Sequence, residues 1–256
     1  MSAAVETVNV KNAVSTEEWE TRVKLAAAYR LIALYGWDDL VFTHISARVP
    51  GPDEHFLINA YGLLFEEMTA SSLVKVDLDG NVVLETPYTF NPAGFTIHSA
   101  IHAAREDVKC IIHTHTRAGI AVSAQRDGLQ ALSQTSLFPL ATIAYHDYEG
   151  VALNEDEKPR LVADLGMNNA FMLRNHGLLT TAPTIEDCFL LMYVFETACQ
   201  IQIMAQSGGG ELVQVDPRIQ AGIKAQAEEV TRGLGGALVW PGLIRKLERT
   251  NPGYDQ

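Results

Sequence analysis

Cysteine is scarce in this 256-residue sequence, and so are basic side chains. The three cysteines, Cys110, Cys188 and Cys199, form an odd set without a Cys-x-x-Cys pair, so neither a disulfide framework nor a thiolate metal site is indicated. Lysine and arginine together number 19 against 31 acidic residues, which gives a formal net charge of −12. Because phosphate neutralisation needs clustered positive charge, we expect no nucleic-acid partner.

Long apolar runs are also missing. Residues 1–20 lack the basic flank and apolar core of a signal peptide. The most apolar stretch, 188–195, is far shorter than the roughly 20 residues that a bilayer-crossing helix needs. We therefore expect a soluble, cytoplasmic protein with no membrane partner. A composition of 47% apolar and 20% charged residues is typical of one compact domain or two small ones.

The order of the expected elements indicates one α/β domain, in which helices cover both faces of a central, mainly antiparallel sheet. A capping box formed by Ser15 and Glu18 predicts a helix that runs to Gly36. Further helices are expected after Pro92, over 117–126, from Asn154 to Gly166, from Thr184 to Gly208 and from Asp216 onward. Short strands are expected over 41–49, 55–60, 74–78, 81–84, 110–115, 138–145, 170–174 and 178–181.

The two ends of the chain differ from its centre. Residues 1–14 lack periodicity, so we expect a flexible N-terminal arm ahead of the domain at 15–210. Residues 211–256 are expected to form a C-terminal helix and tail that pack on the domain or on a neighbouring subunit. The inner stripe of that helix is predicted to contain Ile219, Ile223 and Val230, whereas the tail from residue 233 shows no clear element.

The placement of the histidines is the most informative feature. His113 and His115 lie two apart in an expected strand, which puts both rings on one face, roughly 6–7 Å apart at the backbone. They could share a metal ion, with His176 of an Asn-His-Gly turn as the third ligand. Such a set leaves coordination positions open for catalysis. Taken alone, a His-x-His pair in a strand is more often two hydrogen-bonded side chains than a metal site. His146 is either a general base oriented by Asp147 or a polar loop residue.

Three strings in the sequence resemble the class II aldolase/adducin family: Asn91 to Thr116, Ala144 to Gly150, and Leu173 to Leu178. They occur in the family's order and spacing, and the likeness covers roughly residues 17–210, nearest to the adducin head domain and its bacterial relatives. The resemblance implies an αβα sandwich with a mostly antiparallel sheet, usually a homotetramer with active sites between subunits. It also implies a divalent metal ion on His113, His115 and His176, with zinc first and iron, manganese or cobalt as alternatives.

The sequence departs from the family's aldolases at the positions that matter for their mechanism. Those aldolases carry an acid/base glutamate four residues before the histidine that matches His98, whereas this chain has Gly94, which offers neither a proton nor a ligand. Thr43-His44 and Pro92-Ala93 replace the pairs that hold the phosphate in the aldolases. These departures from the family's aldolases predict a substrate without a phosphate group.

The remaining residues of the implied pocket predict the other roles. We expect catalytic roles for three side chains, His44, His98 and Tyr145. The expected substrate-binding residues are Ser46, Asn59, Tyr61 and Tyr254. His44 would pair with a substrate carboxylate, and His98 would face the metal directly or through water, although either could be a buried structural or core histidine. The two tyrosines Tyr145 and Tyr254 would act across a subunit boundary, or else be ordinary packed aromatics.

The predicted function is that of a metal-dependent lyase, of decarboxylase or aldolase type. Its substrate would be a small unphosphorylated oxo, hydroxy or aromatic carboxylic acid, cleaved through a metal-stabilised enolate. An Fe(II)-dependent oxygenase or oxidative decarboxylase is a second enzyme class that a three-histidine site permits. A non-enzymatic, adducin-like assembly protein is the third alternative. The presence of all three histidines at the metal positions argues against it.

Overall fold

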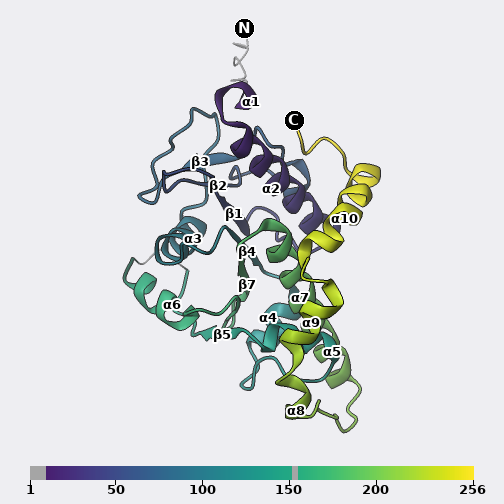
Figure 1. Ribbon diagram of the computed structural model, residues 1–256. Helices are drawn as coiled ribbons and strands as arrows, with labels where there is room; N and C mark the ends of the chain where they lie inside the picture. Colours follow the sequence, from purple (N-terminus) through teal and green to yellow (C-terminus); the bar gives the residue numbers. More distant parts are fainter. Residues whose placement is uncertain (1–9, 152–154) are drawn as a thin grey trace.

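The computed structural model describes residues 10–151 and 155–256, and its centre is one seven-stranded sheet (Figure 1). The strand order is β3-β2-β1-β4-β7-β6-β5. Neighbouring strands are antiparallel except β5 and β6, which are parallel. The predicted α/β fold with a mainly antiparallel sheet is therefore confirmed. The strands are β1 (His44–Arg48), β2 (Phe56–Ile58), β3 (Val74–Val76), β4 (Cys110–Thr114), β5 (Ile143–His146), β6 (Ala170–Leu173) and β7 (Gly177–Ala182).

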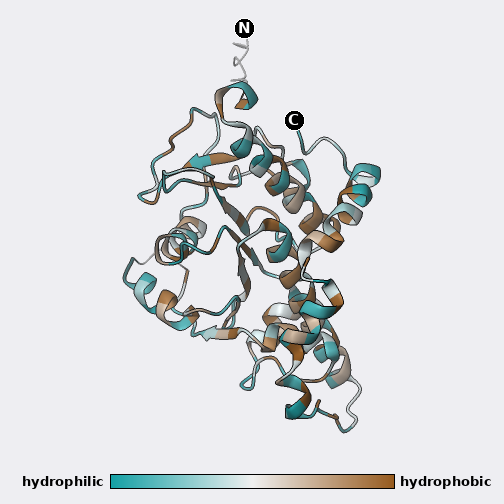
Figure 2. Cartoon of the chain, in the orientation of Figure 1, coloured by the Kyte–Doolittle hydropathy of each residue, from teal (hydrophilic) through white to brown (hydrophobic). Residues whose placement is uncertain are grey.

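Helices cover both faces of the sheet, with α3 and α6 on one side and α2, α7 and α10 on the other (Figure 1). They carry bands of both apolar and hydrophilic residues (Figure 2), as expected of helices with one side on a core. The helices are α1 (Val10–Ala13), α2 (Thr16–Leu34), α3 (Pro92–Ala104), α4 (Arg117–Ser123), α5 (Gln134–Leu140), α6 (Lys158–Leu165), α7 (Ile185–Ser207), α8 (Pro217–Gln220), α9 (Ile223–Thr231) and α10 (Gly236–Thr250), with short 3-10 turns η1 (Phe65–Glu67) and η2 (Glu155–Glu157).

The central strands are buried on both faces, because successive side chains point to opposite sides of a sheet. In β4, Ile112 belongs to the core under α2 and α7, whereas Ile111 packs with the residues of α3 and α6. Leu178 and Leu179 of β7 divide in the same way. This alternation explains why these strands are continuous apolar runs, and it leaves polar side chains at the strand ends, where the histidines lie.

Helix starts are where the sequence predicts structure best. The Ser15 Oγ accepts a hydrogen bond from the Glu18 N–H at 3.1 Å, so the predicted cap of α2 is confirmed. At the start of α3, the Asn91 side chain accepts from the Ala93 N–H, and Pro92 occupies the first turn. Thr184 caps α7 in the same manner.

By length and composition, α7 is the one helix in the described part of the chain that could cross a membrane. It packs instead inside this domain, where Cys188, Phe189 and Phe195 are buried in the main core. We therefore assign α7 as a core helix of the domain.

Two predicted strands are wrong. Residues 134–140 form α5, and only Ile143–His146 of that region is a strand, because Ser133 and Ser136 make a reciprocal capping pair that starts a helix. Residues 81–84 contribute a single bridge between Val82 and Val76. The Asp77 carboxylate binds the backbone N–H groups of the following turn, so the hairpin ladder does not extend.

The C-terminal region differs from its prediction. The helix predicted from Asp216 breaks at Gly222 into α8 and α9. Ile223 is buried as expected, but Ile219 is 53% and Val230 is 79% exposed, so the predicted inner stripe is wrong. The tail contains a helix that was not predicted, α10, in which Pro241 is tolerated because Trp240 and Leu247 anchor the helix in the main core.

Parts of the predicted arm and of the predicted start of α6 lie outside the described residues. Residues 1–9 lie outside the described part of the chain, and the rest of the predicted arm contains the short helix α1, in which Val10 is buried. The predicted cap residue of α6, Asn154, also lies outside the described residues. The helix itself begins at Lys158, directly after η2.

Candidate metal centre

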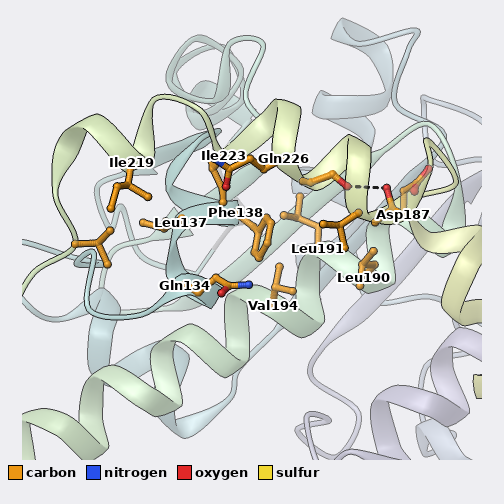
Figure 3. Close-up of a pocket in the computed structure, with 14 residues that line it drawn as sticks. Gln134, Leu137, Phe138, Asp187, Leu190, Leu191, Val194, Ile219, Ile223 and Gln226 are labelled. Atoms are coloured by element: carbon orange, nitrogen blue, oxygen red, sulfur yellow. Dashed lines mark hydrogen bonds between the residues drawn. The ribbon is translucent and has the colours of Figure 1, made fainter.

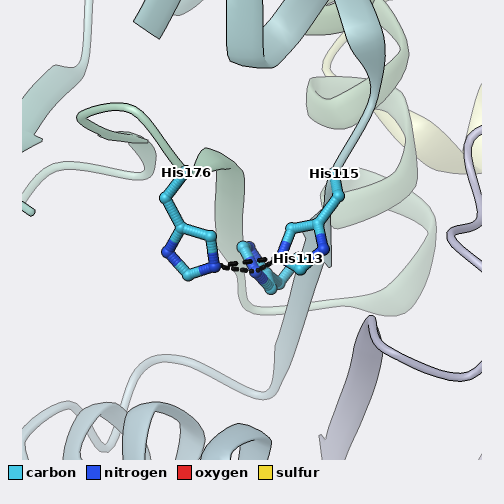
Figure 4. A group of neighbouring side chains, drawn as sticks. All are labelled: His113, His115 and His176. Atoms are coloured by element: carbon cyan, nitrogen blue, oxygen red, sulfur yellow. Dashed lines mark hydrogen bonds between the residues drawn. The ribbon is translucent and has the colours of Figure 1, made fainter. Parts of the chain in front are cut away.

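Three imidazole rings meet at the end of β4. His113 is in this strand, His115 follows it, and His176 lies in the turn between β6 and β7 (Figure 4). The Nε2 atom of His115 is 2.9 Å from that of His113 and 2.9 Å from that of His176, and the third Nε2 pair is 3.3 Å apart. Metal–nitrogen bonds of about 2.0–2.1 Å bring neighbouring ligand atoms to roughly 3 Å of each other. The three atoms therefore fit one divalent ion, and the predicted triad is brought together.

The turn that carries His176 has a local explanation. Asn175 has a φ of +58°, a left-handed conformation that asparagine tolerates better than most residues. At Gly177, an added Cβ would collide with the carbonyl oxygen of Thr114, so only glycine allows this close approach to β4. The Asn-His-Gly string is therefore required by the backbone, and it holds the His176 ring beside the strand that supplies the other two.

The opposite nitrogens of two rings are held by acceptors. The His113 Nδ1–H donates to the Leu178 carbonyl oxygen at 2.9 Å, and the His115 Nδ1–H donates to the Asp39 carboxylate at 3.0 Å. A proton on Nδ1 leaves the Nε2 lone pair free for a metal, and such outer contacts fix the ring orientation. Asp39 was not predicted from the sequence, because an acidic residue after a helix is a common surface feature.

The protonation states suit metal binding. Burial lowers the pKa of His113 well below its ordinary value, and the neighbouring His115 and His176 lower it further. Burial, followed by the charge of His115, lowers the pKa of His176 to about 4. Both rings are therefore neutral at pH 7, which is the form that binds a metal ion.

A cavity of about 370 Å³ adjoins the triad, with His115 and His176 in its wall. None of the described residues that line it is lysine or arginine. Tyr148, which was not predicted, lies with its ring centroid 6.2 Å from that of His176. The other lining residues are mostly apolar or aromatic: Phe42, His44, Tyr61, Asn91, Ala93, Ile97, Gly150 and Val151. The predicted residues His44 and Tyr61 therefore lie on this wall.

A larger cavity, of about 580 Å³, lies elsewhere, between α5, α7 and α9 (Figure 3). Its wall is mostly apolar, with Phe138, Leu191 and Ile223 among its residues. It contains none of the predicted site residues. We therefore place the candidate site at the triad and not at this larger cavity.

The predicted catalytic histidines His44 and His98 form a cluster that begins at the wall of the cavity beside the triad and extends into the protein. The His44 ring lies 5.0 Å from the His113 ring, centroid to centroid. The His44 Nδ1 is 2.9 Å from the His98 Nε2, and the His98 Nδ1 is 2.6 Å from the Ser46 Oγ. Both nitrogens of His98 are thus engaged, so His98 is connected to the triad through His44 and not by direct contact. Ser46 is buried between two histidines and is not on the cavity wall, a position that does not support a substrate contact.

Position 94 is sterically tied to His44. A Cβ atom added at Gly94 would lie 2.6 Å from the Cγ and 2.7 Å from the Nε2 of His44. Such distances are far inside van der Waals contact. The His44 ring therefore fills the space that a side chain at position 94 would need.

Three other predicted residues lie away from the cavity within this chain. The Asn59 side chain is buried and accepts a hydrogen bond from the Tyr29 hydroxyl. The Tyr145 hydroxyl accepts from the Leu129 N–H, and the Tyr254 hydroxyl donates to Glu248 at 2.6 Å. The structure does not bring these three to the triad. The predicted roles of the two tyrosines across a subunit boundary remain predictions.

His146 has different partners from those predicted. Its Nδ1 is 2.7 Å from the Asp164 carboxylate, and its Nε2 is 3.4 Å from that of Glu157. The predicted orientation by Asp147 is therefore wrong, because α6 and η2 bring two other carboxylates to the ring. Both nitrogens are engaged, which favours a structural role for His146.

The sequence and the fold are both similar to those of known proteins. Residues 23–203 match the family described as the Class II Aldolase and Adducin N-terminal domain. A Pseudomonas aeruginosa protein named "Putative aldolase class 2 protein" is 58% identical over 251 residues, which cover 97% of this chain and 96% of that protein. Rat alpha-adducin is 45% identical over 86% of this chain but only 31% of the adducin. The crystal structure of an aldolase II superfamily protein from Pseudomonas syringae has a TM-score of 0.92 and 55% identity, covering 96% of this chain and 99% of that one.

Proposed function

Because this chain belongs to the class II aldolase and adducin family, we propose that it is a metal-dependent carbon–carbon lyase. Its substrate is a small unphosphorylated oxo, hydroxy or aromatic carboxylic acid. The observation that carries this proposal is the cavity, which has two histidines of the triad in one wall and neither lysine nor arginine among its described lining residues. We further propose that the protein is a cytoplasmic homotetramer.

The triad supplies the position for the metal, and zinc is the first candidate for a set of three imidazoles. A divalent cation held there acts as a Lewis acid, stabilising the negative charge that develops beside a substrate carbonyl. His44 lines the same cavity with its ring next to His113, so it is placed to exchange a proton with the substrate. Phe42, Tyr61 and Tyr148 provide an apolar, partly aromatic wall for the rest of the molecule.

The start of α3 supports a substrate without phosphate. A helix N-terminus holds phosphate through its free backbone N–H groups. Here Pro92 has no N–H, and the Ala93 N–H is already bound by the Asn91 side chain at 3.1 Å. With no lysine or arginine among the described lining residues, a phosphate dianion in this cavity would have no cationic side chain to pair with.

Elemental analysis of gently purified protein, followed by turnover assays, tests the proposal. The substrate panel contains oxo acids, hydroxy acids and aromatic carboxylic acids, with sugar phosphates as the comparison, and release of carbon dioxide or an aldehyde is measured. We expect stoichiometric metal and turnover of a member of the unphosphorylated set. Undiminished turnover by protein confirmed to be metal-free, or turnover of sugar phosphates alone, would contradict the proposal. Light scattering during size-exclusion chromatography tests the tetramer.

Two alternatives are each favoured by one observation. A three-imidazole set also suits iron, so an Fe(II)-dependent oxygenase or oxidative decarboxylase would show oxygen consumption with Fe(II) but not with Zn(II). The similarity to rat alpha-adducin favours a non-enzymatic assembly protein. Protein that contains no stoichiometric metal and turns over no member of the panel would support that alternative.

A further inference from the structure

A chain of hydrogen bonds extends from the cavity wall into the protein. It runs from His44 to His98, then to Ser46, and ends at His102, with consecutive heavy-atom distances of 2.9, 2.6 and 2.8 Å. All four side chains are at most 3% exposed. His44 and Ser46 lie two residues apart on β1, so both point to the face of the sheet that α3 covers. His98 and His102 lie one turn apart on α3. Burial therefore separates Ser46, His98 and His102 from bulk water, and of the four only His44 lines the cavity.

The histidines in this chain are neutral. Burial lowers the pKa of His98 well below the ordinary value and that of His102 to about 3, and the His44 ring, 3% exposed, has an imidazole and not a carboxylate as its Nδ1 partner. A neutral imidazole carries one N–H, and a serine hydroxyl carries one O–H. Four groups therefore have four protons, of which three must fill the three hydrogen bonds. The Ser46 Oγ is buried and has these two histidines as its partners among the described residues, so its O–H is satisfied only if it donates to one histidine and accepts from the other.

Only two arrangements satisfy this requirement. If Ser46 donates to His98, then His98 donates from Nε2 to His44, and all three histidines carry their proton on Nε2. If Ser46 donates to His102 instead, every bond is reversed and all three carry it on Nδ1. The His44 ring lines the cavity, and its Nε2 takes no part in these three hydrogen bonds. This nitrogen is a donor in the first arrangement and an acceptor in the second.

The two arrangements differ at the far end of the hydrogen-bond chain, where the His102 Nδ1 is an acceptor in the first and an N–H donor in the second. The Nδ1 of His102 is buried and has no hydrogen-bond partner among the described residues. The backbone of Val108 is near enough to favour the protonated ring, in opposition to burial. Since no charged group terminates the chain, the direction of the Ser46 hydroxyl decides which arrangement is present.

We propose that Ser46 and His98 are positioning residues, which couple the tautomers of the three histidines so that the direction of one hydroxyl sets whether His44 offers the cavity a proton or a lone pair. The coupling requires no group in the chain to become charged. This inference rests on the proposed function at one point, the role of His44 as the group that exchanges a proton with the substrate. Ser46 thus acts through His98 and His44 and does not touch the substrate.

Nitrogen-15 NMR of histidine-labelled protein tests the coupling without any assay of activity, because Nδ1–H and Nε2–H tautomers differ in their ¹⁵N shifts. The signals are assigned with the single variants His44→Gln, His98→Gln and His102→Gln. In the wild-type protein we expect His44, His98 and His102 to share one tautomer. In Ser46→Ala we expect at least one of them to differ from the others, and in Ser46→Thr, which keeps the hydroxyl, the shared tautomer returns.

The kinetic readout separates positioning from binding. An acid/base group typically contributes 10²–10⁴-fold to the rate, so we expect Ser46→Ala to lower kcat about tenfold or more with little change in KM or metal content. The matched control is Ser99→Ala, which removes a buried hydroxyl on α3 that bonds Thr96 and lies outside the chain; it should keep the wild-type kcat and tautomers.

The possible outcomes are distinguishable. Mixed tautomers in the wild-type protein, or identical tautomers and kcat in wild type and Ser46→Ala, would overturn the inference. A metal-loaded wild type that shows a shared tautomer but turns over no substrate would overturn the proposed lyase function and leave the coupling intact. If Ser46→Ala does not fold, the wild-type tautomers and the Ser46→Thr variant still decide the matter.

Discussion

The His44 ring occupies the space into which a side chain at position 94 would project. A Cβ atom at Gly94 would lie 2.7 Å from the His44 Nε2 and 2.6 Å from its Cγ. A glutamate at this position, as in the aldolases that the sequence resembles, would need the same space. The glycine and the histidine are therefore one structural feature, in which an imidazole from β1 replaces a side chain from α3 beside the triad.

Replacing Gly94 by alanine should destabilise the protein. The helix gains about 0.5–1 kcal/mol from losing a glycine, but overpacking against His44 costs about 1–3 kcal/mol. The matched control is Gly242→Ala in α10, where an added Cβ meets nothing closer than the Arg245 side chain at 3.8 Å. Urea unfolding should show a loss for Gly94→Ala and none for the control. In a His44→Ala background, the loss should shrink, and equal losses in both backgrounds would refute the steric coupling.

Removing any triad histidine should abolish metal binding while keeping the fold. For His113→Ala, His115→Ala and His176→Ala we expect the metal content to fall from stoichiometric to below about 0.1 per chain, since two imidazoles seldom hold a metal firmly. Elemental analysis measures the metal content, and circular dichroism measures whether the fold is kept. His55→Ala, at a partly exposed site near Asp53, is the control and should keep its metal. Unchanged metal content in the triad variants would remove the basis of the proposed chemistry.

Asp39→Asn should weaken metal binding without removing a ligand. The carboxylate accepts a hydrogen bond from the His115 Nδ1–H, and loss of such an outer contact typically costs 10–100-fold in metal affinity. Calorimetric titration of metal-free protein with Zn²⁺ measures the change. Asp38→Asn removes the same charge one residue away and should bind as wild type does. If Asp39→Asn and Asp38→Asn lose the same Zn²⁺ affinity, the loss comes from the change in net charge and not from the hydrogen bond to His115.

Stability should fall in mild acid, and His102 should account for part of the loss. Burial, with Arg48 adding repulsion, lowers its pKa in the folded state to about 3, against about 6.5 when unfolded. Between these values the unfolded chain binds the extra proton, so the free energy of unfolding decreases as the pH falls from about 6.5 toward 3. The slope is at most about 1.4 kcal/mol per pH unit for each such histidine.

The variant His102→Gln isolates this contribution. We expect the difference in the free energy of unfolding between pH 7 and pH 5 to be smaller in metal-free His102→Gln than in metal-free wild type. The partly exposed His55 serves as the comparison, because His55→Gln should keep the wild-type difference. An undiminished pH dependence in His102→Gln would show that this ring is protonated without cost in the folded protein.

Local signals explain the parts of the fold that could be predicted. The Ser15 cap, the Pro92 helix start and the apolar strand that contains His113 depend on contacts within a few residues, and each is found where the sequence predicts it. The errors arise where distant contacts override a local signal. Pro241 is typical of a helix break, yet α10 continues through it because Trp240 and Leu247 are buried against the domain.

By itself, the sequence determined the charge of the protein and the candidate metal donors. Period-2 geometry is a local property that puts His113 and His115 on one face, and the resemblance to the family joins His176 of the Asn-His-Gly turn to them. Only the tertiary structure decided what surrounds those donors: Asp39 behind His115, His44 in the space of residue 94, and Ser46 between two histidines. These contacts join residues that are far apart in the chain, so they depend on the pairing of β1 with β4 and on the packing of α3 on the sheet. No local pattern encodes that packing, because it arises from burial of the whole core.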